Sequence, residues 1–190
     1  MILTIGRQLG AGGVEVGKLI AERTGMKFFD KEMIAQASEQ WGLSVECFEG
    51  ADEKIKRGFG FAGLGTLGGD ELFRMQSETI RRLADEHTSD GAIFVGRCAN
   101  YVLRERDDVR SVFLTASHED RVKRVVERFG CSEDDACEMM KKVNRQRETY
   151  YDYYASKTWG KASTYHLCIN TSVFGMEQTV NMIIQTLKLK

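Results

Sequence analysis

A glycine-rich segment near the start of the chain is the first pattern that could bind a ligand. Residues 6–13 are Gly-Arg-Gln-Leu-Gly-Ala-Gly-Gly, between the apolar run Ile2–Ile5 and a helix-period segment with Val16 and Ile20. A strand, a glycine-rich turn and a helix are the context of a phosphate-binding P-loop. Backbone N–H groups in such a turn point, with the helix N-terminus, at an anion. We therefore expect nucleotide phosphates to bind at Gly10, Ala11, Gly12, Gly13 and Val14, although a tight turn without a ligand would have the same sequence.

The signature lysine of the P-loop is missing from this segment. With Gly12 as the second glycine of G-x-x-x-x-G-K-[ST], Gly13 occupies the lysine position and Val14 the hydroxyl position. Arg7 starts the loop and is the best substitute for the lost charge. Lys18 is a poorer candidate, because it lies more than a helical turn past the loop and on another face.

Further polar residues follow other predicted strands. Ligands of open α/β sheets bind at the carboxyl ends of the strands, where Asp30 and Arg97 are found. An arginine can bind a second phosphate through its planar fork, and we favour this role for Arg97 over an ordinary surface charge or a structural salt bridge. Asp30 could orient magnesium through water or cap the next helix.

A cluster of arginines lies between the fourth and fifth predicted strands. Such a segment could close over a nucleotide as a lid, because phosphoryl transfer depends on positioning and on neutralising charge. Individually these side chains could be solvated helix charges, since acidic residues are close enough to pair with them. The preferred functional pair is Arg145 and Arg147, and nearby tyrosines with Trp159 could stack on a base or pack the lid. The arginines are Arg121, Arg124, Arg128, Arg145 and Arg147, and the tyrosines are Tyr150, Tyr151, Tyr153 and Tyr154.

Apolar runs and helix-period segments alternate along the chain, which predicts an α/β fold with a parallel sheet. The expected strands cover residues 2–5, 26–29, 92–95, 111–115 and 166–170. The clearest helical period lies between Leu72 and Leu83, whereas residues 58–69 contain six glycines. We therefore expect a flexible insert over 42–69.

Composition limits the class of protein. A chain of 190 residues suits one sizeable core, and a net charge of −1 argues against a general nucleic-acid binder. No run could span a membrane and no signal segment precedes the first strand, which predicts a cytoplasmic protein. Five cysteines without a C-x-x-C pair and three dispersed histidines indicate neither a disulfide framework nor a metal centre. No pattern indicates an oligomeric state.

Several segments together resemble the cytidylate kinase-like family of P-loop nucleoside monophosphate (NMP) kinases. They are Ile5-Gly-Arg-Gln-Leu-Gly-Ala-Gly-Gly13, Phe28-Phe-Asp-Lys-Glu32, Val95-Gly-Arg-Cys-Ala-Asn-Tyr-Val-Leu103, Phe113-Leu-Thr-Ala116 and the stretch from Arg147 to Ser172. The resemblance implies a three-layer sandwich with a five-stranded parallel sheet in one domain, 1–190. Its core would be 1–30, 91–116 and 161–190, with a helical NMP-binding insert at about 31–90 and an arginine-bearing lid at about 117–160. It also implies ATP and Mg²⁺.

The chain departs from the family pattern at positions that contact the substrate. Gln36 stands where cytidylate kinases carry an arginine, and Cys98 stands where they carry an aspartate, with Asn100 two positions later. We therefore expect an ATP-dependent phosphotransferase acting on an NMP, with CMP or dCMP as the first guess. Arg7, Arg145 and Arg147 would be catalytic, and the acceptor would bind at Asp30, Arg97 and Asn100. The alternatives are a nucleotide-binding regulatory protein with little catalysis and a kinase of another small molecule.

Overall fold

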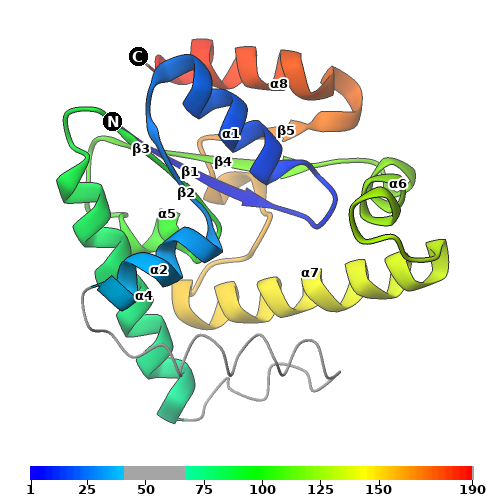
Figure 1. Ribbon diagram of the computed structural model, residues 1–190, viewed down its shortest axis with the longest axis horizontal. Helices are drawn as coiled ribbons and strands as arrows, with labels where there is room; N and C mark the ends of the chain where they lie inside the picture. The colour runs from blue at the N-terminus through cyan, green and yellow to red at the C-terminus, as the bar shows by residue number, and fades with distance from the viewer. Residues whose placement is uncertain (41–66, 190) are drawn as a thin grey trace.

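Five short apolar segments pair in parallel at the centre of the molecule. The computed structural model describes residues 1–40 and 67–189, and its strands follow the order β2-β3-β1-β4-β5 (Figure 1). The strands are β1 (Ile2–Arg7), β2 (Lys27–Phe29), β3 (Ala92–Val95), β4 (Val109–Thr115) and β5 (Leu167–Asn170). All five expected strands are confirmed, with ends that shift by one or two residues.

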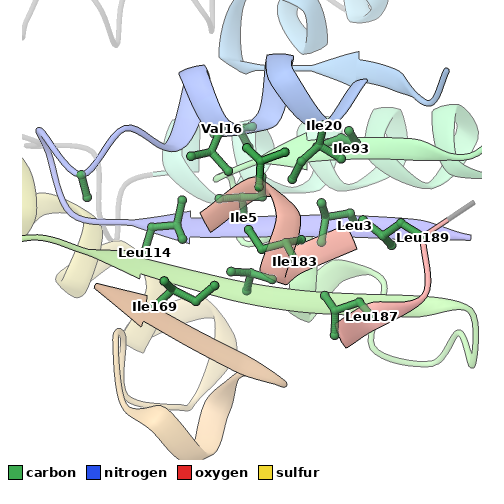
Figure 2. Close-up of a cluster of buried hydrophobic side chains, with 14 of the residues drawn as sticks. Leu3, Ile5, Val16, Ile20, Ile93, Leu114, Ile169, Ile183, Leu187 and Leu189 are labelled. Carbon is green, nitrogen blue, oxygen red and sulfur yellow. The ribbon is translucent and has the colours of Figure 1, made fainter. Parts of the chain in front are cut away.

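Side chains alternate between the two faces of the sheet, as the pleat of a strand requires. In β3, Ile93 and Val95 belong to one buried cluster, whereas Ala92 and Phe94 belong to another on the opposite face. Figure 2 shows the first cluster, in which Leu3 and Ile5 of β1 meet Ile183. Full burial of an aliphatic side chain contributes about 1.5–3 kcal/mol, so these clusters fix the sheet between its helices.

Helices cover both faces of the sheet and make the expected three layers. Helices α1 (Gly13–Thr24) and α8 (Thr171–Leu187) lie on one face, and α8 breaks at Gly175, where φ is 70°. On the other face are α4 (Leu67–Glu86) and α5 (Ala99–Val102), with α2 (Lys31–Gln40) beside α4.

Two further helices extend past the carboxyl ends of the strands. Helix α6 (His118–Phe129) and helix α7 (Glu133–Ala155) pack together, and α7 runs from α6 across to α4 (Figure 1). Each begins with a serine cap: Ser117 Oγ accepts a hydrogen bond from the amide of Asp120, and Ser132 Oγ from that of Asp135. A 3₁₀ turn, η1 (Ala162–Thr164), precedes β5.

The expected flexible insert over 42–69 falls mostly outside the described residues. Its last three residues are helical, because α4 begins at Leu67. The two glycines there cost about 1 kcal/mol each in a helix, which packing of α4 on its neighbours offsets. The division into insert and lid concerns motion and stays a prediction. Within 1–40 and 67–189, no helix is both long and apolar enough to cross a membrane.

Candidate active site

The glycine loop between β1 and α1 has the geometry of an anion site. Gly10 and Gly12 adopt φ values of 82° and 79°, which favour glycine. Gly12 is the N-cap of α1 and offers no side-chain cap. The N–H groups of the first turn of α1 therefore have no acceptor within the helix. Together with the helix dipole, they can bind a phosphate.

Residues distant in sequence hold this loop in place. A Cβ on Gly10 would lie 2.7 Å from the carbonyl oxygen of Arg121, so only glycine allows α6 to approach. Arg124 Nη1 donates to the Gly10 carbonyl oxygen and to Thr171 Oγ1, both at 3.1 Å. Asn144 Oδ1 accepts from the amide of Leu9 at 2.8 Å. Arg124, expected as a solvated charge, is therefore a loop contact, and the local sequence of α6 carries no signal for it.

Close packing surrounds the remaining residues of the glycine loop. A Cβ on Gly12 would lie 2.2 Å from Met176 Cε, which explains its glycine. Ala11 is fully buried, and Val14 packs its side chain against the core below α1. Val14 can therefore offer a phosphate only its backbone N–H.

A cavity of about 260 Å³ opens at the carboxyl ends of β1 and β3. Cations, aromatic rings and amides from several elements line it, which is the mixed character of a small-molecule site. The cations are Arg7, Lys31, Arg97 and Arg147, the rings are Tyr150, Tyr151, Trp159 and Tyr165, and the amides are Asn100 and Gln146.

Three arginines of this cavity form a cluster of positive charge. In the described parts of the chain, none of Arg7, Arg97 and Arg147 has an ion-pair partner. Burial, followed by the charges of Arg147 and Arg97, lowers the pKa of Arg7 well below its usual value. Burial, followed by the charge of Arg97, lowers the pKa of Arg147 to about 10. Because such crowding disfavours the charged forms, a bound anion would relieve it.

Only one member of the expected arginine pair reaches the cavity. Arg147 lines it and donates from Nη1 to the backbone oxygen of Arg7 at 3.0 Å. Arg145 is exposed and does not line it. Residues two apart on an α-helix point about 200° away from each other. The structure therefore does not bring Arg145 to the site.

The expected acceptor residues are placed differently from one another. Asp30 Oδ1 accepts from the amides of Glu32 and Met33 at 3.0 and 3.1 Å, so it caps α2, which is one of the two roles left open for it. Asp30 does not line the cavity, whereas Arg97 and Asn100 do. Asn100 Nδ2 donates to the hydroxyl of Tyr151 at 2.8 Å, which ties α5 to α7.

The turn after β3 is strained at this cavity. Arg97 and Cys98 both have φ of 55°, in the left-handed region that costs a non-glycine residue about 1–3 kcal/mol. Burial raises the pKa of the Cys98 thiol to about 12, so the sulfur is a neutral packing group rather than a nucleophile. Arg97 lines the cavity from this turn.

Comparisons with known proteins find relatives that match this chain over nearly its whole length. The model of the cytidylate kinase-like family matches residues 2–173. Cytidylate kinases from Methanococcus vannielii and Archaeoglobus fulgidus are 27% and 23% identical, covering 99% and 100% of this chain and 100% and 96% of their own. An uncharacterized protein of known structure from Eubacterium ventriosum is 26% identical, with a TM-score of 0.79, over 100% of this chain and 99% of that one. Shikimate kinase from Bacteroides thetaiotaomicron, 16% identical over the same shares, shares the fold with a TM-score of 0.61.

Proposed function

The chain belongs to the cytidylate kinase-like family, and on this premise we propose that it transfers the γ-phosphate of ATP to an NMP, with CMP or dCMP as first candidates. It is a P-loop phosphotransferase of the NMP kinase type. The observation that carries the proposal is the cluster of Arg7, Arg97 and Arg147, which form no ion pair within the described residues, beside a helix N-terminus without a side-chain cap.

The donor phosphates would bind to the glycine loop. The backbone N–H groups of residues 10–14 supply the contacts, and the glycines keep side chains out of the site. Among the described residues no three His, Cys, Asp or Glu side chains gather to bind a metal. Proteins usually bind Mg²⁺ through substrate phosphates, water and one or two carboxylates, so the ion would enter together with ATP. Bound there, the ion would neutralise charge on the transferring group.

The acceptor phosphate would bind at the other side of the cavity. Arg97 approaches it from the end of β3 and Arg147 from α7, and both line the same space. Asn100 supplies an amide on that wall. An acceptor that is already a phosphate monoester carries an anionic oxygen nucleophile, so the reaction needs no general base. The protein's contribution is then alignment and charge stabilisation.

Formation of nucleoside diphosphate tests this proposal. The purified protein is incubated with ATP and Mg²⁺ and with CMP, dCMP, UMP, AMP or GMP in turn, beside the variant Arg97→Ala. We expect turnover of one or two of these nucleotides, with a loss of about a hundredfold in the variant. Absence of turnover with all five nucleotides would contradict an NMP acceptor.

Loss of the usual lysine and hydroxyl at Gly13 and Val14 favours a second candidate, a nucleotide-binding regulatory protein with little catalysis. Tight ATP binding by calorimetry, without transfer to any acceptor, would support it.

The departures at Gln36 and Cys98 favour a third candidate, a kinase of another small molecule. Cytidylate kinases carry an arginine and an aspartate at these positions, so groups that would contact the nucleotide are changed. A screen in which all nucleotides are inert and one metabolite is phosphorylated would identify that acceptor.

A further inference from the structure

We infer that Arg7 replaces the missing loop lysine through a slot between two glycines, which brings its guanidinium between the donor loop and Arg97. The phosphates named in this inference rest on the proposed function. The path of the side chain rests on the structure alone.

The first wall of the slot is Gly13, at the position of the motif lysine. A Cβ on Gly13 would lie 2.7 Å from Arg7 Cγ, 3.1 Å from its Cβ and 3.2 Å from its Cδ. The aliphatic stem of Arg7 therefore runs directly across the first residue of α1. A side chain at position 13 would therefore displace Arg7 from its observed position.

The second wall of the slot is Gly96, at the end of β3. A Cβ on Gly96 would lie 2.1 Å from Arg7 Nη1 and 3.0 Å from its Cζ. The guanidinium therefore reaches across from β1 to the neighbouring strand. Since β3 continues into Arg97, Arg7 spans the gap between the donor loop and the strained turn that carries Arg97.

The surroundings of the guanidinium point to an anion as its partner. The structure gives it no acidic side chain within ion-pair distance in residues 1–40 and 67–189. Arg147 donates to the backbone oxygen of Arg7. The positive charges of Arg147 and Arg97 each act on the Arg7 guanidinium more strongly than the negative charge of Asp30 does. Lys18 is exposed and its Nζ lies 6.0 Å from the centre of the Phe28 ring. Arg124 also contacts the loop, but its Nη1 donates to the Gly10 carbonyl oxygen and to Thr171 Oγ1, and it does not line the cavity. Of these three cations, Arg7 is the one that lines the cavity.

A guanidinium at this point can bind oxygens of two phosphates at once, because its N–H groups form a planar fork. The lysine of an ordinary P-loop is a point charge that reaches the β- and γ-phosphates from position 13. In this chain Arg7, the last residue of β1, supplies the positive charge instead. Arg7 would bind the phosphoryl group on both the donor and the acceptor side and stabilise the charge spread over it during transfer.

Substitutions at positions 7 and 13 test this inference. Four variants are compared with the wild type for kcat, KM and ATP affinity: Arg7→Ala, Gly13→Ala, Arg7→Ala with Gly13→Lys, and Arg110→Ala. Arg110 is the matched control, a strand arginine whose Nη1 donates to the backbone oxygens of Asp107 and Val109 away from the cavity. Thermal unfolding of each variant reports its stability.

We expect Arg7→Ala to lower kcat about a hundredfold or more and to weaken ATP binding about tenfold, with Arg110→Ala unchanged. Gly13→Ala adds a helix-favouring residue, so it should remain folded while displacing Arg7 and lowering kcat about tenfold. The double variant should recover activity over Arg7→Ala, because removal of Cγ and Cδ vacates the space at position 13. Guanidinium ion at millimolar concentration should likewise rescue Arg7→Ala alone.

Other results would overturn the inference. They are an Arg7→Ala variant within threefold of wild type in both kcat and ATP affinity, or a loss that neither Gly13→Lys nor guanidinium ion relieves. The measurement of ATP affinity separates this inference from the proposed function. If the wild type transfers phosphate to no acceptor but binds ATP, and Arg7→Ala weakens that binding, the proposed NMP kinase activity is rejected and the role of Arg7 at the phosphates is retained.

Discussion

The backbone oxygen of Arg7 accepts a hydrogen bond from Arg147 Nη1 at 3.0 Å, which ties the end of β1 to the middle of α7. The bond joins residues 140 positions apart in the chain. It means that the position of α7 over the cavity and the position of the glycine loop depend on each other. Under the proposed function Arg147 would have a second role, because a guanidinium has further N–H groups that can bind a phosphate.

The first prediction concerns this arginine. Arg147→Ala should lower kcat about a hundredfold, because it removes a half-buried charge from the cavity that we propose holds the transferring group. Arg147→Lys should retain part of the activity, since lysine keeps the charge but loses the planar fork. Steady-state kinetics with ATP and the best acceptor from the panel measure both.

Arg145→Ala is the natural comparison, because Arg145 lies on the same helix but is exposed. Its loss of kcat should be at least tenfold smaller than that of Arg147→Ala. Equal losses would show that α7 rotates or moves before transfer, so that Arg145 also reaches the phosphates.

The second prediction concerns the close approach of α6 to the loop. Gly10→Ala should lower the free energy of unfolding by roughly 2–4 kcal/mol, through left-handed strain and a Cβ 2.7 Å from the Arg121 carbonyl oxygen. Gly25 has a similar φ of 75°, but no atom lies within 4 Å of the place that a Cβ would take there. Gly25→Ala should therefore cost only about 1–2 kcal/mol. Urea unfolding of both variants measures the difference, and equal costs would remove the contact with α6 from the explanation.

The fold was predictable because its signals are local. The apolar strands alternate with helix-period segments, and Ser117 and Ser132 stand three residues before the amides that they cap. The periodicity of α7 could also have separated its two arginines. Val143, Tyr150 and Tyr151 line the cavity at four residues before and at three and four residues after Arg147. Arg145 does not share that spacing.

The contacts that fix the site were not predictable in the same way. Arg124 bonds to a carbonyl oxygen 114 residues away, and Asn144 to an amide 135 residues away. Nothing in the local sequence of α6 or α7 distinguishes such side chains from solvated ones. The placement of Arg7 could be predicted in part. The sequence shows an arginine at the start of the glycine loop, but only the strand order shows that its side chain passes between Gly13 and Gly96.

The third prediction concerns coupling between the proposed insert and the proposed lid. The rings of Phe73 and Tyr154 stack with centroids 4.0 Å apart at 9°, and the Tyr154 hydroxyl donates to Asp70 Oδ1 at 3.0 Å. The Tyr150 hydroxyl donates to Gln76 Oε1, and the rings of Phe73 and Tyr150 meet edge to face, so several contacts join α4 and α7. These contacts predict that α4 and the second half of α7 open together.

Hydrogen exchange of Phe73→Ala tests this coupling. Losing the stack should destabilise the pair by about 1–3 kcal/mol and speed exchange in both helices, not in α4 alone. Phe129→Ala, which truncates an exposed ring on α6, is the control. A bisubstrate analogue should slow exchange over 117–160 in the wild type. Faster exchange confined to α4 would contradict joint opening.

The fourth prediction uses Cys98 as a reporter of whether the cavity is closed in solution. Burial raises the pKa of this thiol to about 12, and only the thiolate is alkylated at a useful rate. At pH 8 the thiolate would be on the order of one part in ten thousand, so reaction with iodoacetamide should be very slow. The rate should rise about tenfold per pH unit from 7 to 9, because this range lies far below the pKa.

Peptide mass spectrometry after timed alkylation measures this rate, with the half-buried Cys131 as the internal comparison. Cys98 should react far more slowly than Cys131 at pH 8. Because Cys98 lies against Tyr150 and Tyr151, separation of α7 from the turn after β3 would expose it. Comparable rates at the two cysteines would therefore mean that α7 leaves the cavity frequently without a ligand, and a bound nucleotide should then protect Cys98 alone.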